Sequence, residues 1–236
     1  MLKKEEITRF KKQILLSEIG FNGQLTLKNA KIAVVGAGGL GCPVLQYLAS
    51  CGVGTIGIID FDIVDVSNLH RQILYSVNDL GAKKVDVAAK KIEQLNKECL
   101  IHKHDTLLNE NNAQEIFKNY DLIIDGSDNF LTRYAVNDAC VKLNIPLVYG
   151  SILGFEGQLA VFNFKGGKNL RDLFPESPNK EDVPDCSENG VLGSLPGVIG
   201  TMMANEALKI ILSLPCLKNQ LIVFDTKNLI FNKIEF

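Results

Sequence analysis

The sequence is poor in the residues that most often carry metal or redox chemistry. Among its 236 residues there are only three histidines, and none of its six cysteines is spaced as a CxxC pair. The spacing therefore predicts neither a zinc knuckle nor a thioredoxin-like motif, and a disulfide framework is not expected in a cytosolic chain of this size. Five cysteines lie in apolar or helical contexts and are interpreted as small core residues. They are Cys42, Cys51, Cys99, Cys140 and Cys216.

The sequence also lacks an excess of charge of one sign and a long apolar run. Its formal net charge is −2, which gives no electrostatic reason to expect a nucleic-acid partner. No apolar run approaches the roughly 20 residues of a membrane span, and the first residues are mixed polar rather than an apolar signal segment. We therefore expect a cytoplasmic protein with no membrane association. It should form one domain, because single cores stop growing near about 250 residues.

No Ser-His-Asp or Cys-His arrangement can be argued from the order of the residues. His102 and His104 alternate on an expected strand and would share one face, but no third metal ligand stands near them. The residues therefore do not predict a histidine-based catalyst or metal site.

Short apolar runs alternate with helical patterns over residues 30–150. A run such as residues 31–35, bounded by glycine, is typical of a buried parallel strand. Alternation at this rhythm predicts an α/β fold with a Rossmann-like, doubly wound and mostly parallel sheet. The expected strands are residues 31–35, 55–59, 99–103, 121–125 and 146–149, and the expected helices are residues 40–51, 81–96, 113–118 and 129–143.

The last third of the chain has a different character. Strands are expected at residues 158–162, 221–224 and 228–234, the last two as a hairpin, and they would extend the sheet in antiparallel fashion. Residues 165–193 have no periodicity, which at this length predicts a functional or disordered loop. Residues 194–212 predict a helix whose small residues would let another element approach closely. These small residues are Gly197, Gly200 and Ala204.

Helical spacing also marks the N-terminus, over residues 5–16, before a connection that contains glycine and asparagine. We therefore divide the single domain, residues 1–236, into three parts. They are a helical arm (1–29), a core (30–150), for which the glycine-rich loop described next predicts nucleotide binding, and a C-terminal part (151–236).

A glycine-rich loop follows the first expected strand. Glycines occupy the first, third and sixth positions of residues 36–41, which lets a strand turn sharply into a helix so that backbone N–H groups can face a phosphate. About twenty residues later, Asp60 ends the next strand, where a carboxylate can accept hydrogen bonds from ribose hydroxyls. The loop alone also suits an NAD-binding protein or a structural turn.

A polar cluster follows Asp60 near the same edge of the sheet. Residues 67–72 are Ser-Asn-Leu-His-Arg-Gln, and Asn68 and Arg71 lie just beyond the carboxyl end of a strand, where ligands bind in such folds. A guanidinium there suits a triphosphate, whereas an NAD enzyme has no evident need for it. Lys84, in the first turn of the next expected helix, is a candidate charge clamp beside a phosphate, although a lone lysine is more often solvated.

Two further residues are candidates for chemistry. Asp128 follows the fourth expected strand, and it either caps the helix that starts at Asn129 or serves as a magnesium ligand, since magnesium takes few protein oxygens and keeps waters. Cys186 lies among polar residues of the long loop, where a cysteine is a better nucleophile candidate than a buried one. Its acidic neighbours disfavour a thiolate, so the residues alone leave its role open.

In this order, the motifs resemble those of the ThiF/MoeB family, the bacterial relatives of ubiquitin-activating enzymes, over nearly the whole chain. The resemblance implies an adenylyltransferase that uses ATP and magnesium and works as a homodimer. Its substrate would be a small ubiquitin-fold sulfur carrier that ends in Gly-Gly, whose C-terminal glycine it would activate. The motifs that carry it are residues 9–16, residues 36–41, Asp60 with residues 67–72, Lys84, residues 125–129, residues 157–158, residues 190–193 and residues 197–200.

The resemblance also implies roles for individual residues. Arg71, Lys84 and Asp128 would act on the triphosphate, with Asp128 as the magnesium ligand. Cys186 matches the crossover-loop cysteine that can join covalently to the carrier in some members, and residues 151–236 would bind the carrier. The residues expected to bind the nucleotide are Gly36, Gly38, Gly39, Gly41, Asp60, Asp62, Ser67, Asn68, Leu69, His70, Arg71, Gln72, Lys84, Asp128 and Asn129.

Three departures from the family pattern modify these expectations. Lys12 stands where the family often has an arginine that reaches into the partner subunit's phosphate site, and a lysine loses the two-pronged geometry. Asn169 and Asp172 stand where the first CxxC pair of the usual zinc site would be, and the chain ends before the second, so no zinc site is expected. We expect no rhodanese-like domain, and therefore a separate sulfur donor such as a cysteine desulfurase or a rhodanese.

The residues do not identify the carrier. We favour a carrier of thiamine thiazole biosynthesis, and a molybdopterin-pathway carrier with a similar Gly-Gly tail is the alternative. Two other hypotheses remain. One is an NAD-dependent oxidoreductase, which only the glycine loop and Asp60 support. The other is a non-catalytic subunit that docks a carrier, but such a subunit would not require the charged residues of the phosphate site.

Overall fold

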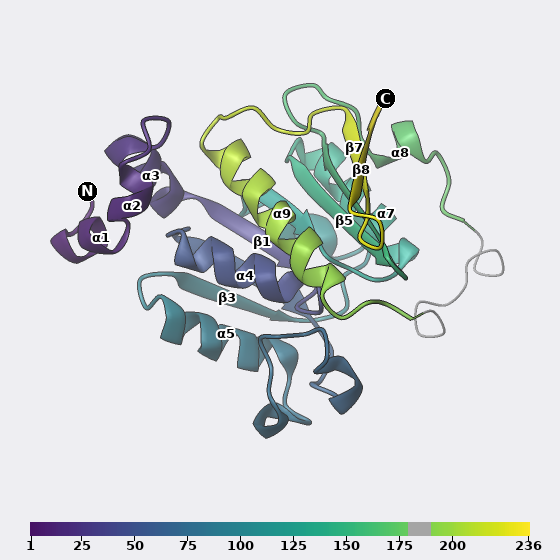
Figure 1. The fold of residues 1–236 in the computed structure, drawn as a ribbon, viewed down its shortest axis with the longest axis horizontal. Coiled ribbons are helices and arrows are strands. Elements are labelled where there is room, and N and C mark those ends of the chain that lie inside the picture. The colour runs from purple at the N-terminus through teal and green to yellow at the C-terminus, as the bar shows by residue number, and fades with distance from the viewer. Residues whose placement is uncertain (179–189) are drawn as a thin grey trace.

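The fold is organised around one eight-stranded sheet, which a computed structural model describes for residues 1–178 and 190–236. The strand order is β3-β2-β1-β4-β5-β6-β7-β8, and Figure 1 shows the sheet in the middle of the molecule. The strands are β1 (Lys31–Val35), β2 (Thr55–Asp60), β3 (Leu100–Asp105), β4 (Leu122–Asp125), β5 (Leu147–Leu153), β6 (Glu156–Phe162), β7 (Gln220–Asp225) and β8 (Ile230–Glu235).

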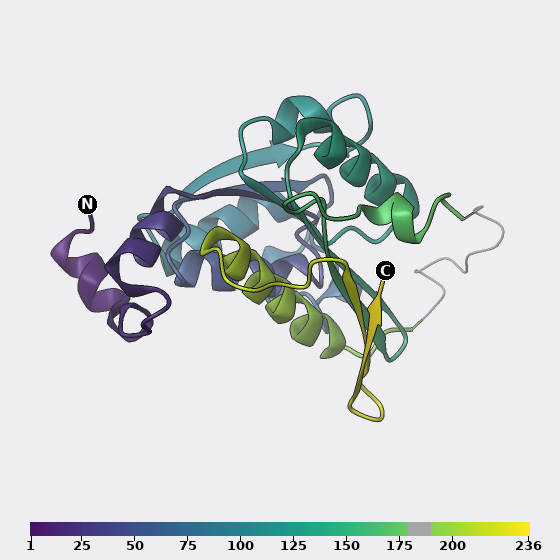
Figure 2. The same cartoon turned by 90° about the horizontal axis from the view of Figure 1, so that it is seen from above.

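Strands β1 to β5 are parallel, and helices cover both faces of this part of the sheet. Helices α4 (Gly41–Ser50), α5 (Lys84–Leu95) and α9 (Leu195–Ile211) lie on one face, and α6 (Ala113–Phe117) and α7 (Phe130–Leu143) lie on the other (Figure 2). Because both faces are covered, β1 and β2 are almost continuously apolar instead of alternating. The predicted doubly wound α/β fold is confirmed.

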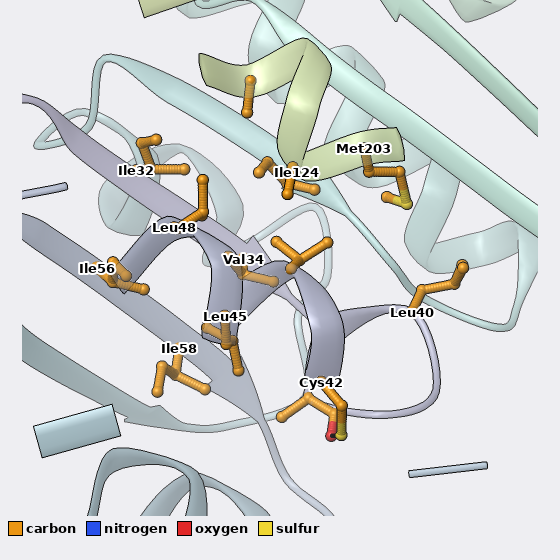
Figure 3. Close-up of a cluster of buried hydrophobic side chains, with 14 of the residues drawn as sticks. Ile32, Val34, Leu40, Cys42, Leu45, Leu48, Ile56, Ile58, Ile124 and Met203 are labelled. Atoms are coloured by element: carbon orange, nitrogen blue, oxygen red, sulfur yellow. Dashed lines mark hydrogen bonds between the residues drawn. The ribbon is translucent and has the colours of Figure 1, made fainter. Parts of the chain in front are cut away.

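The larger part of the core lies on the face of the sheet that α4, α5 and α9 cover, with α4 over its centre. Figure 3 shows Leu45 and Leu48 of α4 over Val34 of β1 and over Ile56 and Ile58 of β2, and all five side chains are fully buried. Burying an aliphatic side chain contributes about 1.5–3 kcal/mol. This packing therefore holds α4, and with it the loop that precedes α4, against the edge of the sheet.

The sheet continues beyond β5 in antiparallel fashion, as the sequence predicts. Strand β5 is longer than expected because it pairs with β6 from Leu147 opposite Phe162 to Leu153 opposite Glu156. Strands β6, β7 and β8 then follow as antiparallel neighbours, so the predicted C-terminal hairpin is confirmed.

The N-terminal arm differs from the prediction. Instead of one helix over residues 5–16, the chain forms α1 (Lys4–Arg9) and α2 (Lys11–Ile14), and the expected connection contains a third helix, α3 (Gly20–Asn29). The break falls at Phe10, which is buried. An ion pair of 2.7 Å between Lys28 Nζ and Glu6 Oε2 ties α3 to α1, so tertiary contacts decide this arrangement.

Two expectations for the C-terminal part also need correction. The irregular segment contains a short helix, α8 (Leu170–Leu173), which Asn169 caps through its side chain together with Asp172. Gly200 does allow close packing, because a Cβ there would lie 2.5 Å from the carbonyl oxygen of Leu40. The expectation was wrong for Gly197, where a Cβ would meet no atom within 4 Å.

Within the described residues, none of the helices combines the length and the apolar character that crossing a membrane requires.

A candidate nucleotide-binding site at the carboxyl edge of the sheet

The strand order creates a crevice next to β1. From β1 the chain adds β2 and then β3 on one side, whereas β4 and β5 lie on the other. The loops after β1 and β4 therefore leave the sheet in different directions, which is where ligands bind in open parallel sheets. A cavity of about 720 Å³ lies at this position.

Most of the residues predicted to bind a nucleotide line this one cavity. Leu69 and Gly41 do not: Leu69 packs against the apolar core, and Gly41 begins α4. The predicted residues that line the cavity are Gly36, Gly38, Gly39, Asp60, Asp62, Ser67, Asn68, His70, Arg71, Gln72, Lys84, Asp128 and Asn129.

The observed path of the glycine loop requires a residue without a side chain at two positions. Gly36 has φ +87°, and a Cβ there would lie 2.9 Å from the carbonyl oxygen of Gly126. A Cβ on Gly41 would lie 1.9 Å from the carbonyl oxygen of Gly36, a distance that no packed structure tolerates. These contacts let the glycine loop approach both the loop after β4 and the start of α4 closely, which places the N-terminus of α4 beside the cavity.

Asp60 fastens the glycine loop to the end of β2. Its Oδ2 accepts a hydrogen bond from the backbone N–H of Ala37 at 2.7 Å, and its Oδ1 accepts one from the N–H of Asp62 at 2.8 Å. Burial raises the pKa of Asp60, while Lys84 and both N–H groups act in the opposite direction. The predicted contact of Asp60 with a ribose stays a prediction.

The polar cluster is built on a single turn of 3-10 helix, Val66–Asn68. Asp65 begins this turn by accepting a hydrogen bond from the N–H of Ser67 at 2.8 Å. The carbonyl oxygen of Ser67 in turn accepts a hydrogen bond from Arg71 Nη1 at 3.0 Å and lies 2.9 Å from His70 Nδ1. This turn therefore orients the guanidinium of Arg71 at the cavity.

Lys84 is not a solvated surface lysine. It is 4% exposed, and its Nζ donates to Asp62 Oδ2 at 2.8 Å. The backbone N–H of Lys84 also donates to the carbonyl oxygen of Asp62 at 2.9 Å. The start of α5 is thus tied to the segment after β2, and a buried ammonium group lines the cavity.

Buried polar atoms without a partner show that the cavity suits a polar ligand. Among the residues described, Gln72 Oε1 and Ser127 Oγ are buried and accept or donate no hydrogen bond, and both residues line the cavity. Such atoms are uncommon in native proteins because each one costs free energy. A ligand with hydroxyl, amino and phosphate groups could satisfy them.

Arg133 is a residue of this site that the sequence did not reveal. It lines the cavity, and its two terminal nitrogens donate to Tyr149 Oη and to the carbonyl oxygen of Ser127, each at 2.8 Å. Burial raises the pKa of Asp125, and the nearby charge of Arg133 opposes this rise. Its spacing in the sequence could have indicated its place at the site, because Arg133 follows Asn129 by four residues and therefore lies on the same face of the helix.

The helix cap at α7 is Asn129 rather than Asp128. Asn129 Oδ1 accepts a hydrogen bond from the N–H of Thr132 at 2.9 Å, so the alternative in which Asp128 caps this helix was wrong. Asp128 is exposed and lines the cavity. A carboxylate oxygen in this position fits magnesium, which binds few protein oxygens together with substrate phosphates and water.

Lys12, in contrast, does not line this cavity within one chain. Lys12 is exposed on α2, in the arm that precedes the amino end of β1 and lies at one end of the molecule in Figure 1. Cys186 lies outside the described residues. Asn169 and Asp172 form a helix cap, and the described part of the chain brings together no group of three or more histidine, cysteine or acidic residues that could hold a metal ion.

The chain resembles known proteins both in sequence and in fold. It is 47% identical over 237 residues to a Thermus thermophilus protein named sulfur carrier protein adenylyltransferase. This match covers 98% of this chain and 88% of that protein. It is also 51% identical over 209 residues to a Porphyra purpurea protein named probable molybdopterin-synthase adenylyltransferase. This match covers 88% of this chain and 55% of that protein. Among solved structures, E. coli MccB matches with a TM-score of 0.86 at 21% identity over 99% of this chain and 71% of that one.

Several curated relatives are about twice as long as this chain, which spans 51–54% of their length. The likeness to MccB concerns the fold alone. The family model is more specific: the one described as the ThiF family matches residues 10–236. From this match and from the relative in Thermus thermophilus, we conclude that the chain belongs to the ThiF family.

Proposed function

We propose that this protein adenylates the C-terminal glycine of a small ubiquitin-fold sulfur carrier, with ATP as the donor of the adenylyl group. The observation that carries this proposal is the meeting of Arg71, Lys84 and Asp128 with the glycine loop at one cavity. A guanidinium, an ammonium group and a carboxylate that can hold magnesium are the groups that a reacting triphosphate needs. The name of the relative in Thermus thermophilus supports the same activity.

The chemistry requires position and charge rather than a proton acceptor. A C-terminal carboxyl group, with a pKa near 3.5, is ionised at neutral pH and can attack the α-phosphorus without a general base. One P–O bond forms as the bond to the bridging oxygen breaks, and the electron pair leaves with pyrophosphate. Correct orientation of the reactants contributes on the order of 7–11 kcal/mol in favourable cases.

The protein's contribution is to oppose the repulsion between two anions. Arg71 and Lys84 place positive charge at the cavity, where exclusion of water makes it effective. Asp128 would hold magnesium, which when bound neutralises charge on the phosphates. We further propose that the protein is a homodimer in which Lys12 of the arm adds a positive charge at the partner's site.

A second cavity offers a path for the tail of the carrier. It has a volume of about 720 Å³ and is lined mainly by β5, the start of α7 and the segment that follows α8. Its lining includes Arg133, Ile152 and Leu153, which also line the first cavity. An extended peptide in the second cavity could therefore bring its terminal carboxylate to the triphosphate.

The carrier is the finer part of the proposal. The carrier of thiamine thiazole biosynthesis is our first candidate. The alternative is a molybdopterin-pathway carrier, which the name of the Porphyra purpurea relative supports. ATP–pyrophosphate exchange with each carrier from the same organism distinguishes them, because only the true substrate should support rapid exchange. The proposal also includes a separate sulfur donor.

Ligand binding separates this function from an NAD-dependent oxidoreductase. We expect ATP with magnesium, at about 100 times its dissociation constant, to raise the midpoint of thermal unfolding by roughly 5–10 °C, because the ligand binds only the folded state. NAD at the same concentration should leave the midpoint unchanged. Stabilisation by NAD and not by ATP would overturn the proposal.

The thiol of Cys186 is not needed for adenylation. We expect Cys186→Ala to retain wild-type ATP–pyrophosphate exchange with the carrier, since the carboxylate attacks phosphorus directly. Sulfur transfer to the carrier, measured separately with a sulfur donor, is the step at which this thiol could act. Loss of exchange in a folded Cys186→Ala protein would contradict the proposed order of steps.

A further inference from the structure

The ion pair between Lys84 and Asp62 joins two groups with very different access to solvent. The Lys84 side chain is 5% exposed and the Asp62 side chain is 48% exposed, and 2.8 Å separates Lys84 Nζ from Asp62 Oδ2. A buried ammonium group costs free energy unless a hydrogen-bonded anion compensates it. Asp62 therefore stabilises Lys84 in the protein without nucleotide.

The backbone holds Asp62 in this position without help from a ligand. Its N–H donates to Asp60 Oδ1 at 2.8 Å, and its carbonyl oxygen accepts from the N–H of Lys84 at 2.9 Å. Both side chains line the cavity proposed for the triphosphate. A polyphosphate that reached Lys84 would thus meet a carboxylate already bound to the same ammonium group.

We propose that Asp62 acts as a stand-in for a phosphate: its carboxylate holds the Lys84 ammonium in place before ATP binds, and a phosphate group replaces it afterwards. This inference rests on the proposed function, since it needs ATP in the cavity. A carboxylate offers two anionic oxygens to a cation, as a phosphate does. Asp62 is therefore a positioning residue that keeps Lys84 ready and lowers the affinity for ATP.

The affinity for ATP gives the first test. Asp62→Asn keeps the shape of the side chain and removes its charge, so ATP with magnesium should bind more tightly, by on the order of fivefold in the dissociation constant measured by titration calorimetry. The matched control is Asp105→Asn, which removes the partner of the neighbouring Lys83 from an exposed pair and should not change the dissociation constant. Unchanged or weaker binding of ATP to Asp62→Asn would overturn the inference.

A double-mutant cycle without nucleotide gives the second test. Asp62→Asn should lower the denaturant midpoint of the nucleotide-free protein, and it should have little effect when Lys84 is already methionine, because the two residues act as a pair. Equal effects in both backgrounds would mean that Asp62 does not hold Lys84. If the wild-type protein binds no ATP, the proposed function fails, whereas normal wild-type binding without a gain in Asp62→Asn overturns this inference alone.

Discussion

Replacing Arg71 or Asp128 by alanine is expected to reduce carrier-dependent ATP–pyrophosphate exchange by on the order of 100- to 1000-fold. Arg71 carries positive charge that opposes the negative charge developing on the phosphates, and its guanidinium is oriented by the carbonyl oxygen of Ser67. Asp128 is exposed at the same cavity and would hold magnesium. Neither side chain contributes to the apolar core, so both variants should fold.

Asp86→Ala is the control for this loss of activity. Asp86 forms an ion pair with Lys103 in which both side chains are about half exposed, and such pairs contribute about 0–1 kcal/mol to stability. We expect wild-type exchange and a wild-type circular dichroism spectrum. Wild-type exchange in Arg71→Ala or Asp128→Ala would remove that residue from the proposed phosphate site.

The largest structural effect is expected for Gly41→Ala. The added Cβ would lie 1.9 Å from the carbonyl oxygen of Gly36, so the glycine loop and the start of α4 must move apart. Overpacking of this kind typically costs about 1–3 kcal/mol, and the displaced loop should no longer bind ATP. Chemical denaturation and titration with ATP and magnesium measure the two effects.

Gly197→Ala provides a matched control in another helix. A Cβ there would meet no atom within 4 Å, and alanine is favoured over glycine inside a helix by roughly 0.5–1 kcal/mol. This variant should be as stable as the wild type or slightly more stable, and its affinity for ATP should not change. If Gly41→Ala behaved like Gly197→Ala, the close contact at the glycine loop would not be important for the site.

Some features of the site arise only because distant segments meet. The ion pair between Lys84 and Asp62 joins residues that are 22 positions apart, and neither residue by itself indicates that the lysine is buried. Arg133 contacts Tyr149 and the Ser127 carbonyl, so its place at the cavity depends on β5 as well as on its own helix. The unsatisfied Gln72 Oε1 and Ser127 Oγ likewise cannot be inferred from a pattern of residue types.

The N-terminal arm illustrates the same limit for the fold. Residues 20–29 contain two glycines and two asparagines, which favour turns over helix. The observed helix α3 is held by contacts outside itself, among them the Lys28–Glu6 ion pair and the hydrogen bond from Gln24 Nε2 to the carbonyl oxygen of Cys51. The low helix propensity of these residues predicted a connection, but tertiary contacts stabilise a helix there instead.

By itself the sequence determined the order of strands and helices in the core, the antiparallel extension of the sheet and nearly half of the residues that line the cavity. The strands and helices follow from apolar periodicity, and the main candidates at the cavity follow from the rule that side chains at the carboxyl ends of parallel strands meet at one edge. The resemblance to the ThiF/MoeB family supplied the other predicted nucleotide-binding residues. Only the tertiary structure decided which charges are buried, which are paired and which polar atoms are left without a partner. The physical reason is that burial and pairing depend on segments far apart in the chain, whereas periodicity and turn chemistry depend on near neighbours.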